Sequence, residues 1–225
     1  MPKELKAVAS IRYYTGSAEK RKDDFDGIWM VNALKYGSVK GYIRRKIRGQ
    51  TRKFDQENLQ AFLPLLHRQM SGMILDRIDS HASLVPIPNS IVTDPSSDGF
   101  KTLDLAKGIA GWSGDRLKVV PALVFAEPQP KSREGGSRNP AYLESVMRIS
   151  AATKGPVVLL DDVTTTQAHF IAAYRKLLKA GANVILATAF AFSTKEQAEN
   201  PMKPYDFRID VSEPQDVLAQ FFGIS

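Results

Sequence analysis

The chain has 225 residues, with 31 Lys and Arg against 24 Asp and Glu, so its formal net charge is +7. This length suits one α/β domain, with or without a sizeable addition, and a hydrophobic fraction of 43% is enough for a packed core. Cysteine is absent, which excludes disulfide scaffolds, Cys-ligated zinc, iron–sulfur clusters and thiol nucleophiles. The positive charge favours an anionic ligand, either nucleic acid or a small phosphate.

Residues 1–80 form a strongly basic segment whose apolar pattern predicts mostly helical structure. One amphipathic stretch begins at Ile28, and a second extends from Leu59 to Ile78 with Pro64 inside it, where we expect a kink. Between them, residues 40–53 carry a run of Lys and Arg around Tyr42. We interpret this run as the charged face of a helix, and contact with a nucleic-acid backbone is the alternative.

Residues 81–225 alternate between strand-like and helix-like patterns and are predicted to form an α/β core. The run Val157–Leu160 is continuously apolar, as in a parallel strand covered on both faces. A helix and a further apolar run follow it, so the three elements form a crossover that predicts a doubly wound parallel sheet. The expected strands are 82–88, 117–125 (interrupted by Pro121), 157–160 and 184–190; the expected helices are 100–110 and 170–179; and 127–140 is expected to be a polar loop.

Two carboxylates, Asp161 and Asp162, follow the apolar strand, and a hydroxyl-rich turn follows them. Ligands of open α/β sheets bind at the carboxyl ends of the strands. The free N–H groups and the dipole of the next helix favour a phosphate, whereas carboxylates accept hydrogen bonds from sugar hydroxyls or bind Mg²⁺. This order of groups predicts a site for a phosphorylated sugar. The alternative is a solvated loop in which one Thr caps the helix.

The same segment resembles the ribosyl-phosphate signature of type I phosphoribosyltransferases, in which a buried strand, an acidic pair and a Thr-rich turn follow one another. The resemblance implies that Asp161 and Asp162 face the ribose of phosphoribosyl pyrophosphate and bind Mg²⁺. It also implies that the following turn wraps the 5′-phosphate, through Thr164, Thr165, Thr166, Gln167, Ala168 and His169. Gln167 stands where the family usually has Gly, so we expect its side chain to crowd a tight turn. His169 stands where the family usually has Thr.

Other segments resemble the ComF-type (competence-associated) branch of these transferases in the same chain order. Leu84–Pro88 is similar to the strand end that precedes the branch's pyrophosphate loop, and we expect anion contacts at Pro88, Asn89 and Ser90 through backbone N–H groups and the Ser90 hydroxyl. The alternative is a rigid strand exit. Residues 129–139 are similar to its flexible loop, and we expect Lys131, Arg133 and Arg138 to close over pyrophosphate and stabilise the leaving group. The alternative is a solvated connection. The branch's Cys-rich zinc ribbon is missing.

These features predict an α/β fold of the type I phosphoribosyltransferase kind, in which residues 1–80 act as a mostly helical hood over a core of residues 81–225. The expected activity is Mg²⁺-dependent transfer of phosphoribosyl to an unknown nitrogenous acceptor with release of pyrophosphate. A non-catalytic phosphoribosyl-ligand sensor and a ComF-like nucleic-acid-handling protein that uses residues 40–53 are the alternatives. We expect a cytoplasmic protein without a membrane segment or a signal peptide, and leave a homodimer open.

Overall fold

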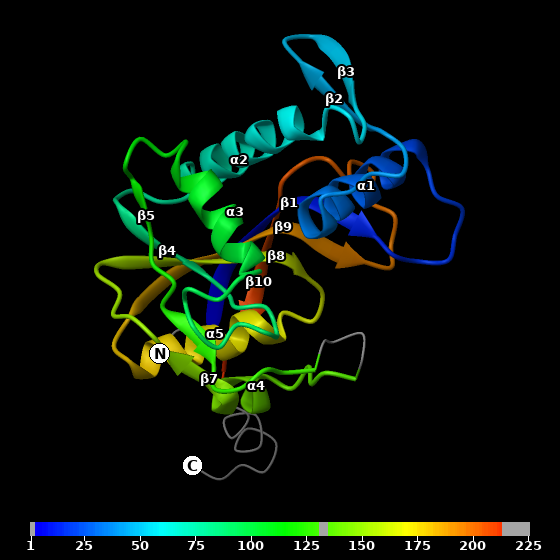
Figure 1. Ribbon diagram of the computed structural model, residues 1–225. Coiled ribbons are helices and arrows are strands. Elements are labelled where there is room, and N and C mark those ends of the chain that lie inside the picture. The colour runs from blue at the N-terminus through cyan, green and yellow to red at the C-terminus, as the bar shows by residue number, and fades with distance from the viewer. Residues whose placement is uncertain (1–2, 131–134, 213–225) are drawn as a thin grey trace.

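The computed structural model describes residues 3–130 and 135–212 (Figure 1). Its centre is a six-stranded sheet with the order β10-β1-β9-β8-β4-β5. The β1–β10 pair is antiparallel and every other pair is parallel. The strands are β1 (Glu4–Tyr14), β4 (Ala82–Pro86), β5 (Leu117–Val119), β8 (Pro156–Thr164), β9 (Asn183–Thr194) and β10 (Tyr205–Asp210).

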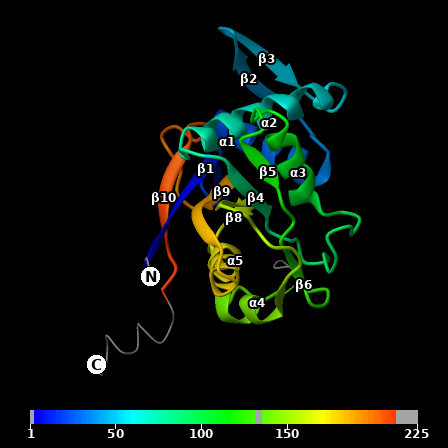
Figure 2. The same ribbon diagram turned by 90° about the vertical axis from the view of Figure 1, so that its left-hand side faces the viewer.

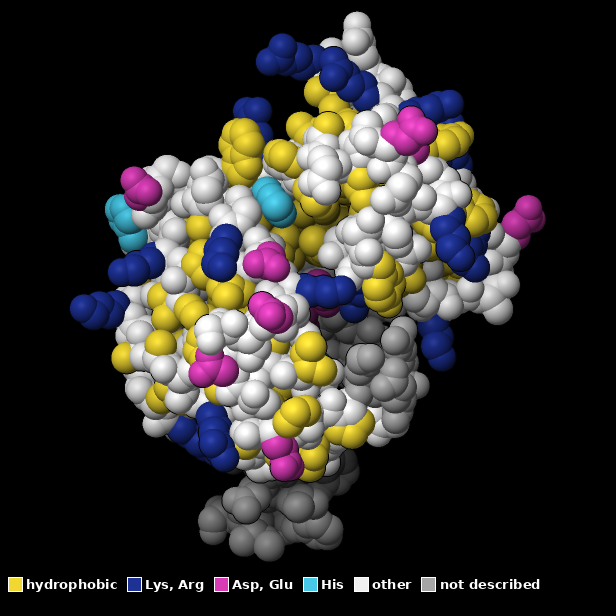
Figure 3. Space-filling model, viewed as in Figure 1, with side chains coloured by type: hydrophobic (Ala, Val, Ile, Leu, Met, Phe, Trp, Pro, Cys, Tyr) yellow, Lys and Arg dark blue, Asp and Glu magenta, His cyan; other side chains and the backbone are white. Residues whose placement is uncertain are grey.

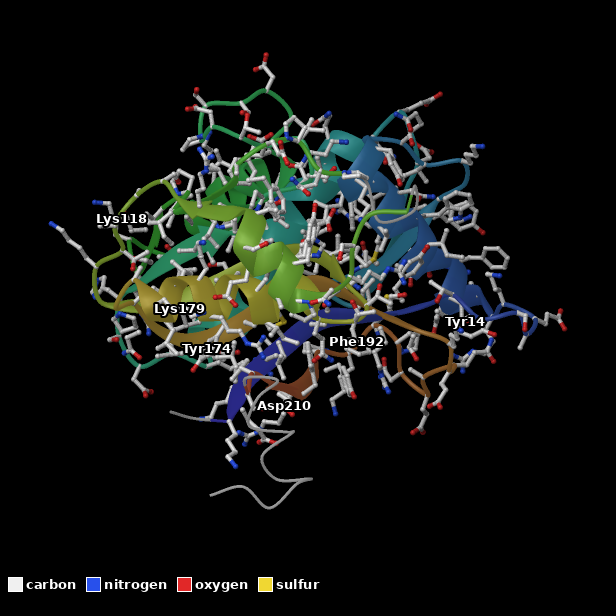
Figure 4. All side chains as sticks on the ribbon, turned by 90° about the horizontal axis from the view of Figure 1, so that it is seen from below. Tyr14, Lys118, Tyr174, Lys179, Phe192 and Asp210 are labelled. Atoms are coloured by element: carbon white, nitrogen blue, oxygen red, sulfur yellow. The ribbon has the colours of Figure 1, made fainter. Side chains whose placement is uncertain are left out.

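Helices cover both faces of this sheet, and each face has its own apolar core (Figure 2). On one face lie α1 (Lys22–Tyr36), α2 (Leu59–Leu75) and α3 (Lys101–Ala110), and the core on this face contains Phe62 of α2 and Phe190 of β9, both fully buried. On the other face lie α4 (Pro140–Val146) and α5 (Ala168–Lys179), which bury Phe170. Lys179 of α5 donates to a Glu144 carboxylate oxygen of α4 at 2.5 Å, and Figure 4 shows Lys179 on this face. The predicted doubly wound α/β architecture is therefore confirmed.

The crossover β8–α5–β9 is the part of the fold that the apolar pattern predicted best. Val157–Leu160 are all fully buried, as a strand covered by helices on both faces requires. The amphipathic helix α5 follows, and β9 pairs with β8 in parallel. The interruption at Pro121 is also confirmed, since β5 belongs to the main sheet whereas β6 (Leu123–Phe125) pairs with β7 (Met147–Ile149) in a separate one.

The N-terminal 80 residues contain the helices α1 and α2, but they also contain strands that the sequence interpretation missed. β1 lies inside the main sheet between β9 and β10, so this segment supplies part of the core as well as a cover for it. The interpretation of residues 40–53 as a helix face is wrong. They form an antiparallel hairpin of β2 (Ile43–Ile47) and β3 (Gln50–Phe54). Among the described helices, none is both long and apolar enough to cross a membrane.

Candidate functional site

A cleft of about 650 Å³ opens at the carboxyl ends of β4 and β8. It is bounded by the last turn of α1, the segment after β4, the loop before α4, and the connection from β8 into α5. Every described residue of the predicted site lines it: Pro88, Asn89, Ser90, Arg138, Asp161, Asp162, Thr164, Thr165, Thr166, Gln167, Ala168 and His169. Lys131 and Arg133 lie outside the described residues. A second hollow, between α2 and β10, contains none of the predicted residues, and its Arg77 and Asp206 are paired with each other at 2.7 Å.

The acid pair stands at the end of β8, where the strand still pairs with β9 through Thr164. An Asp161 carboxylate oxygen accepts from the Asp162 backbone N–H at 2.7 Å, and an Asp162 oxygen accepts from the Val163 N–H at 2.5 Å. The Asp161 carboxyl lies deep in the protein, although part of the residue reaches the cleft. This burial, together with the negative charge of Asp162, raises the pKa of Asp161 well above its usual value. Both effects favour the neutral form of the Asp161 carboxyl over its charged form.

Lys35 is a site residue whose place the sequence did not reveal. It lies in the last turn of α1, and its Nζ is 3.3 Å from an Asp162 oxygen. Lys101 of α3 donates to the backbone carbonyl of Lys35, so cations from two helices meet at the cleft. The contact joins residues far apart in the chain, so no local pattern predicts it.

The turn after β8 places the first residues of α5 against the cleft. Gln167 has φ 61°, in the left-handed region that glycine adopts without a steric penalty. This agrees with the expectation of a tight turn at that position. The first N–H groups of a helix have no partner within the helix, so the start of α5 offers donors to an anion. Burial lowers the pKa of His169, so its imidazole is neutral at pH 7 until an anion lies beside it.

The opposite wall of the cleft is the segment after β4, and it contains an unpaired polar atom. Oδ1 of Asn89 is buried and has no hydrogen-bond partner within the described part of the chain. The backbone of this segment is nevertheless ordered by hydrogen bonds, from the Gln129 N–H to the Ser90 carbonyl at 2.6 Å and from the Val92 N–H to the Asn89 carbonyl at 2.9 Å. A buried polar group without a partner is uncommon, and it indicates a position where water or a ligand completes the pairing.

The electrostatic balance of the cleft favours an anion. Lys35, Lys101 and Arg138 bring three positive charges to a cleft whose acidic side chains are those of Asp161 and Asp162. The described residues include no cluster of three or more His, Asp or Glu side chains able to hold a metal ion. Mg²⁺ that arrives with phosphates needs only one or two carboxylates from the protein. The acid pair fits that role, although Asp162 would have to exchange its contact with Lys35.

Comparisons with known proteins add little to this description. No family model and no curated protein matches the chain. Among solved structures, it is similar to a hypoxanthine phosphoribosyltransferase from Staphylococcus aureus, with a TM-score of 0.39 and 8% identity over 75% of this chain and 78% of that chain. A likeness this distant supports no conclusion about activity, so the chemistry has to be inferred from the cleft itself.

Proposed function

We propose that this protein is a phosphoribosyltransferase that binds phosphoribosyl pyrophosphate with Mg²⁺ in the cleft at the end of β8. The observation that carries the proposal is that the acid pair and the turn into α5 share one cleft with the cations Lys35, Lys101 and Arg138. A ligand with a sugar in the middle and a phosphate at each end matches this sequence of groups. Asp161 and Asp162 would face the ribose hydroxyls, and residues 164–169 would hold the 5′-phosphate.

The pyrophosphate would lie toward the segment after β4 and the loop before α4. The Ser90 hydroxyl and the Asn89 side-chain NH₂ would donate to it, and Arg138 would offset the charge that develops as it leaves. Magnesium, when bound, would neutralise pyrophosphate oxygens beside the acid pair. In the transfer, the bond from the anomeric carbon to the pyrophosphate oxygen breaks with its electron pair, and a bond to the acceptor nitrogen forms. The acceptor proton passes to solvent, since a nucleophile held in position needs no dedicated base.

The acceptor would enter beside α1, which contributes Lys35 and Tyr36 to the rim of the cleft. These residues belong to the segment that was expected to act as a hood. The side chain of Tyr36 is exposed and has the Lys101 ammonium 5.7 Å from its ring centre. An exposed aromatic ring at the mouth of the cleft suits a planar nitrogenous acceptor, because such a ring stacks on a flat partner.

The test is binding of isotope-labelled phosphoribosyl pyrophosphate. We expect saturable binding that depends on Mg²⁺ and is abolished by Asp161→Asn/Asp162→Asn. The matched control, Asp79→Asn/Asp104→Asn, removes two exposed carboxylates away from the cleft and should bind like the unmodified protein. Absence of binding, or equal loss in the two double variants, would refute the proposal.

A second candidate is a non-catalytic sensor that binds the same ligand, and the left-handed Gln167 favours it. A strained residue in the phosphate turn is compatible with binding but departs from the glycine of the transferase signature. Pyrophosphate release with a panel of nucleobases and amines separates the two candidates. Turnover with any acceptor supports the transferase, whereas tight binding and slow release with all of them supports the sensor.

A further inference from the structure

The hairpin β2–β3 is a separate two-stranded sheet that projects from one end of the molecule. Figures 1 and 2 show it beyond α2, at the far side of the molecule from α4 and α5. Its base is firmly attached, since Ile43 and Phe54 are buried and the Phe54 ring lies 5.6 Å from that of Phe62 in α2. The hairpin is therefore a rigid extension of the folded protein.

Residues 40–53 contain seven Lys and Arg and no acidic residue. Two of these cations are used inside the protein. Arg44 pairs with the buried carboxylate of Asp26 in α1 at 2.8 Å, and Arg45 donates to the Gln69 side chain in α2. Figure 3 shows Lys and Arg side chains gathered at the hairpin end of the molecule.

The outer cations form no ion pair among the described residues. Lys46, Arg48 and Arg52 are all exposed. In the pairing of β2 with β3, Arg52 lies directly opposite Arg45. Like charges directly opposite each other destabilise a sheet. The pairing of Arg52 with Arg45 therefore lowers the stability of the hairpin, which indicates that these charges have a role other than folding.

The turn at the tip of the hairpin also contains a residue that costs stability. Arg48 and Gly49 have φ values of 49° and 83°, as the two central residues of a type I′ turn require. Asn, Asp or Gly normally occupies the first of these positions, because other side chains are strained there. The chain instead places an arginine at the most exposed point of the hairpin. Strain that serves no purpose in folding is a characteristic of functional positions.

We propose that the outer half of this hairpin, defined by Lys46, Arg48 and Arg52, binds the phosphate backbone of double-stranded DNA. A two-stranded ribbon fits the major groove of B-form DNA, whereas the deep, narrow major groove of duplex RNA does not admit side chains. Single-strand binding relies on rows of exposed aromatic rings. Tyr42 is the single aromatic residue between Lys40 and Lys53, and the Lys53 ammonium lies 4.6 Å from the centre of its ring. Contacts to phosphates by these three cations give little sequence preference.

The test uses fluorescence anisotropy with a labelled 20-base-pair duplex over a series of salt concentrations. Each phosphate contact contributes about −0.9 to the slope of log affinity against log salt, so Lys46→Gln/Arg48→Gln/Arg52→Gln should make the slope shallower by roughly 2.7. Affinity at low salt should fall at least about tenfold. The control, Lys118→Gln/Lys195→Gln/Lys203→Gln, removes the same charge from exposed positions elsewhere and should keep the slope. Arg44 and Arg45 are unsuitable for this test because they attach the hairpin to α1 and α2.

Equal loss in the two triple variants would mean that net charge alone attracts DNA, and it would overturn the proposal. Tighter binding to a single strand of the same length, or to vesicles with anionic lipid, would overturn it as well. A further variant, Arg48→Asn, puts a residue that tolerates positive φ at the tip. It should raise the melting temperature and weaken duplex binding, whereas a purely structural arginine would change only the first. None of these measurements depends on phosphoribosyl pyrophosphate, so the hairpin and the cleft are tested independently.

Discussion

Replacing Gln167 with glycine tests whether the turn at the start of α5 is strained. Gln167 has φ 61° and ψ 4°, and its side chain makes no capping hydrogen bond to the helix, so the substitution removes no side-chain cap. A left-handed conformation costs a non-glycine residue roughly 1–2 kcal/mol. Glycine adopts it freely but loses roughly 0.5–1 kcal/mol more conformational entropy on folding. The net expectation for Gln167→Gly is a gain of about 0.5–1 kcal/mol.

In a chain of this length, about 1 kcal/mol shifts the melting temperature by roughly 2–4 °C, so Gln167→Gly should melt about 1–4 °C higher. Differential scanning calorimetry is the assay. Gln167→Ala is the matched control, because it removes the same side chain and keeps the strain, and it should leave the melting temperature close to that of the unmodified protein. A rise in Gln167→Ala equal to that in Gln167→Gly would refute the reasoning, since the side chain rather than the backbone would then be the source of the penalty. A fall in Gln167→Gly would also refute it.

Three further predictions concern the cleft and the packing around the sheet. Lys35→Met should weaken phosphoribosyl pyrophosphate binding by about three- to tenfold in calorimetric titrations, a modest loss because the ion pair is partly exposed, whereas Lys35→Arg should retain most of the affinity. Burial lowers the pKa of His169 and a bound phosphate raises it, so binding takes up a proton and the affinity should increase as the pH falls from about 8 to about 6.5. His169→Asn should remove most of that increase, and an unchanged pH profile would place the phosphate elsewhere. Gly16→Ala would bring the new Cβ within 2.6 Å of the Lys195 backbone oxygen and should cost about 1–3 kcal/mol, seen as a lower melting temperature. Gly72→Ala, which meets no atom within 4 Å, is its control and should not destabilise the protein.

The sequence was most informative where one local pattern decides the structure. The apolar run of β8, the amphipathic helix α5 and the apolar run of β9 each follow from their own residues, and together they locate the carboxyl end of a parallel strand. That is enough to place Asp161 and Asp162 at the edge of a sheet.

The features that the sequence missed depend on contacts between distant residues or on an unusual turn. The pairing of Lys35 with Asp162 needs the packing of α1 against the sheet, which no periodicity reveals. The hairpin β2–β3 was mistaken for a helix because its tip is Arg48-Gly49 rather than Asn-Gly, and because its charges hide the alternation of Ile43, Arg45 and Ile47. The run of Lys and Arg correctly indicated a basic surface at residues 40–53, but it did not reveal that their backbone forms two paired strands.

The position of β1 has a consequence for how this protein is made. β1 is synthesised long before its partners, since Ala7 pairs with Ala187 of β9 and Val8 pairs with Asp206 of β10. At about 5–20 residues per second, roughly 10–40 s of synthesis separate β1 from its partners. During that interval an apolar strand has both edges unpaired, and such segments are prone to aggregate or to recruit chaperones. A deletion or a bulky fusion near Glu4 therefore acts on an inner strand of the sheet and should reduce the yield of folded protein more than the same change next to Gly49.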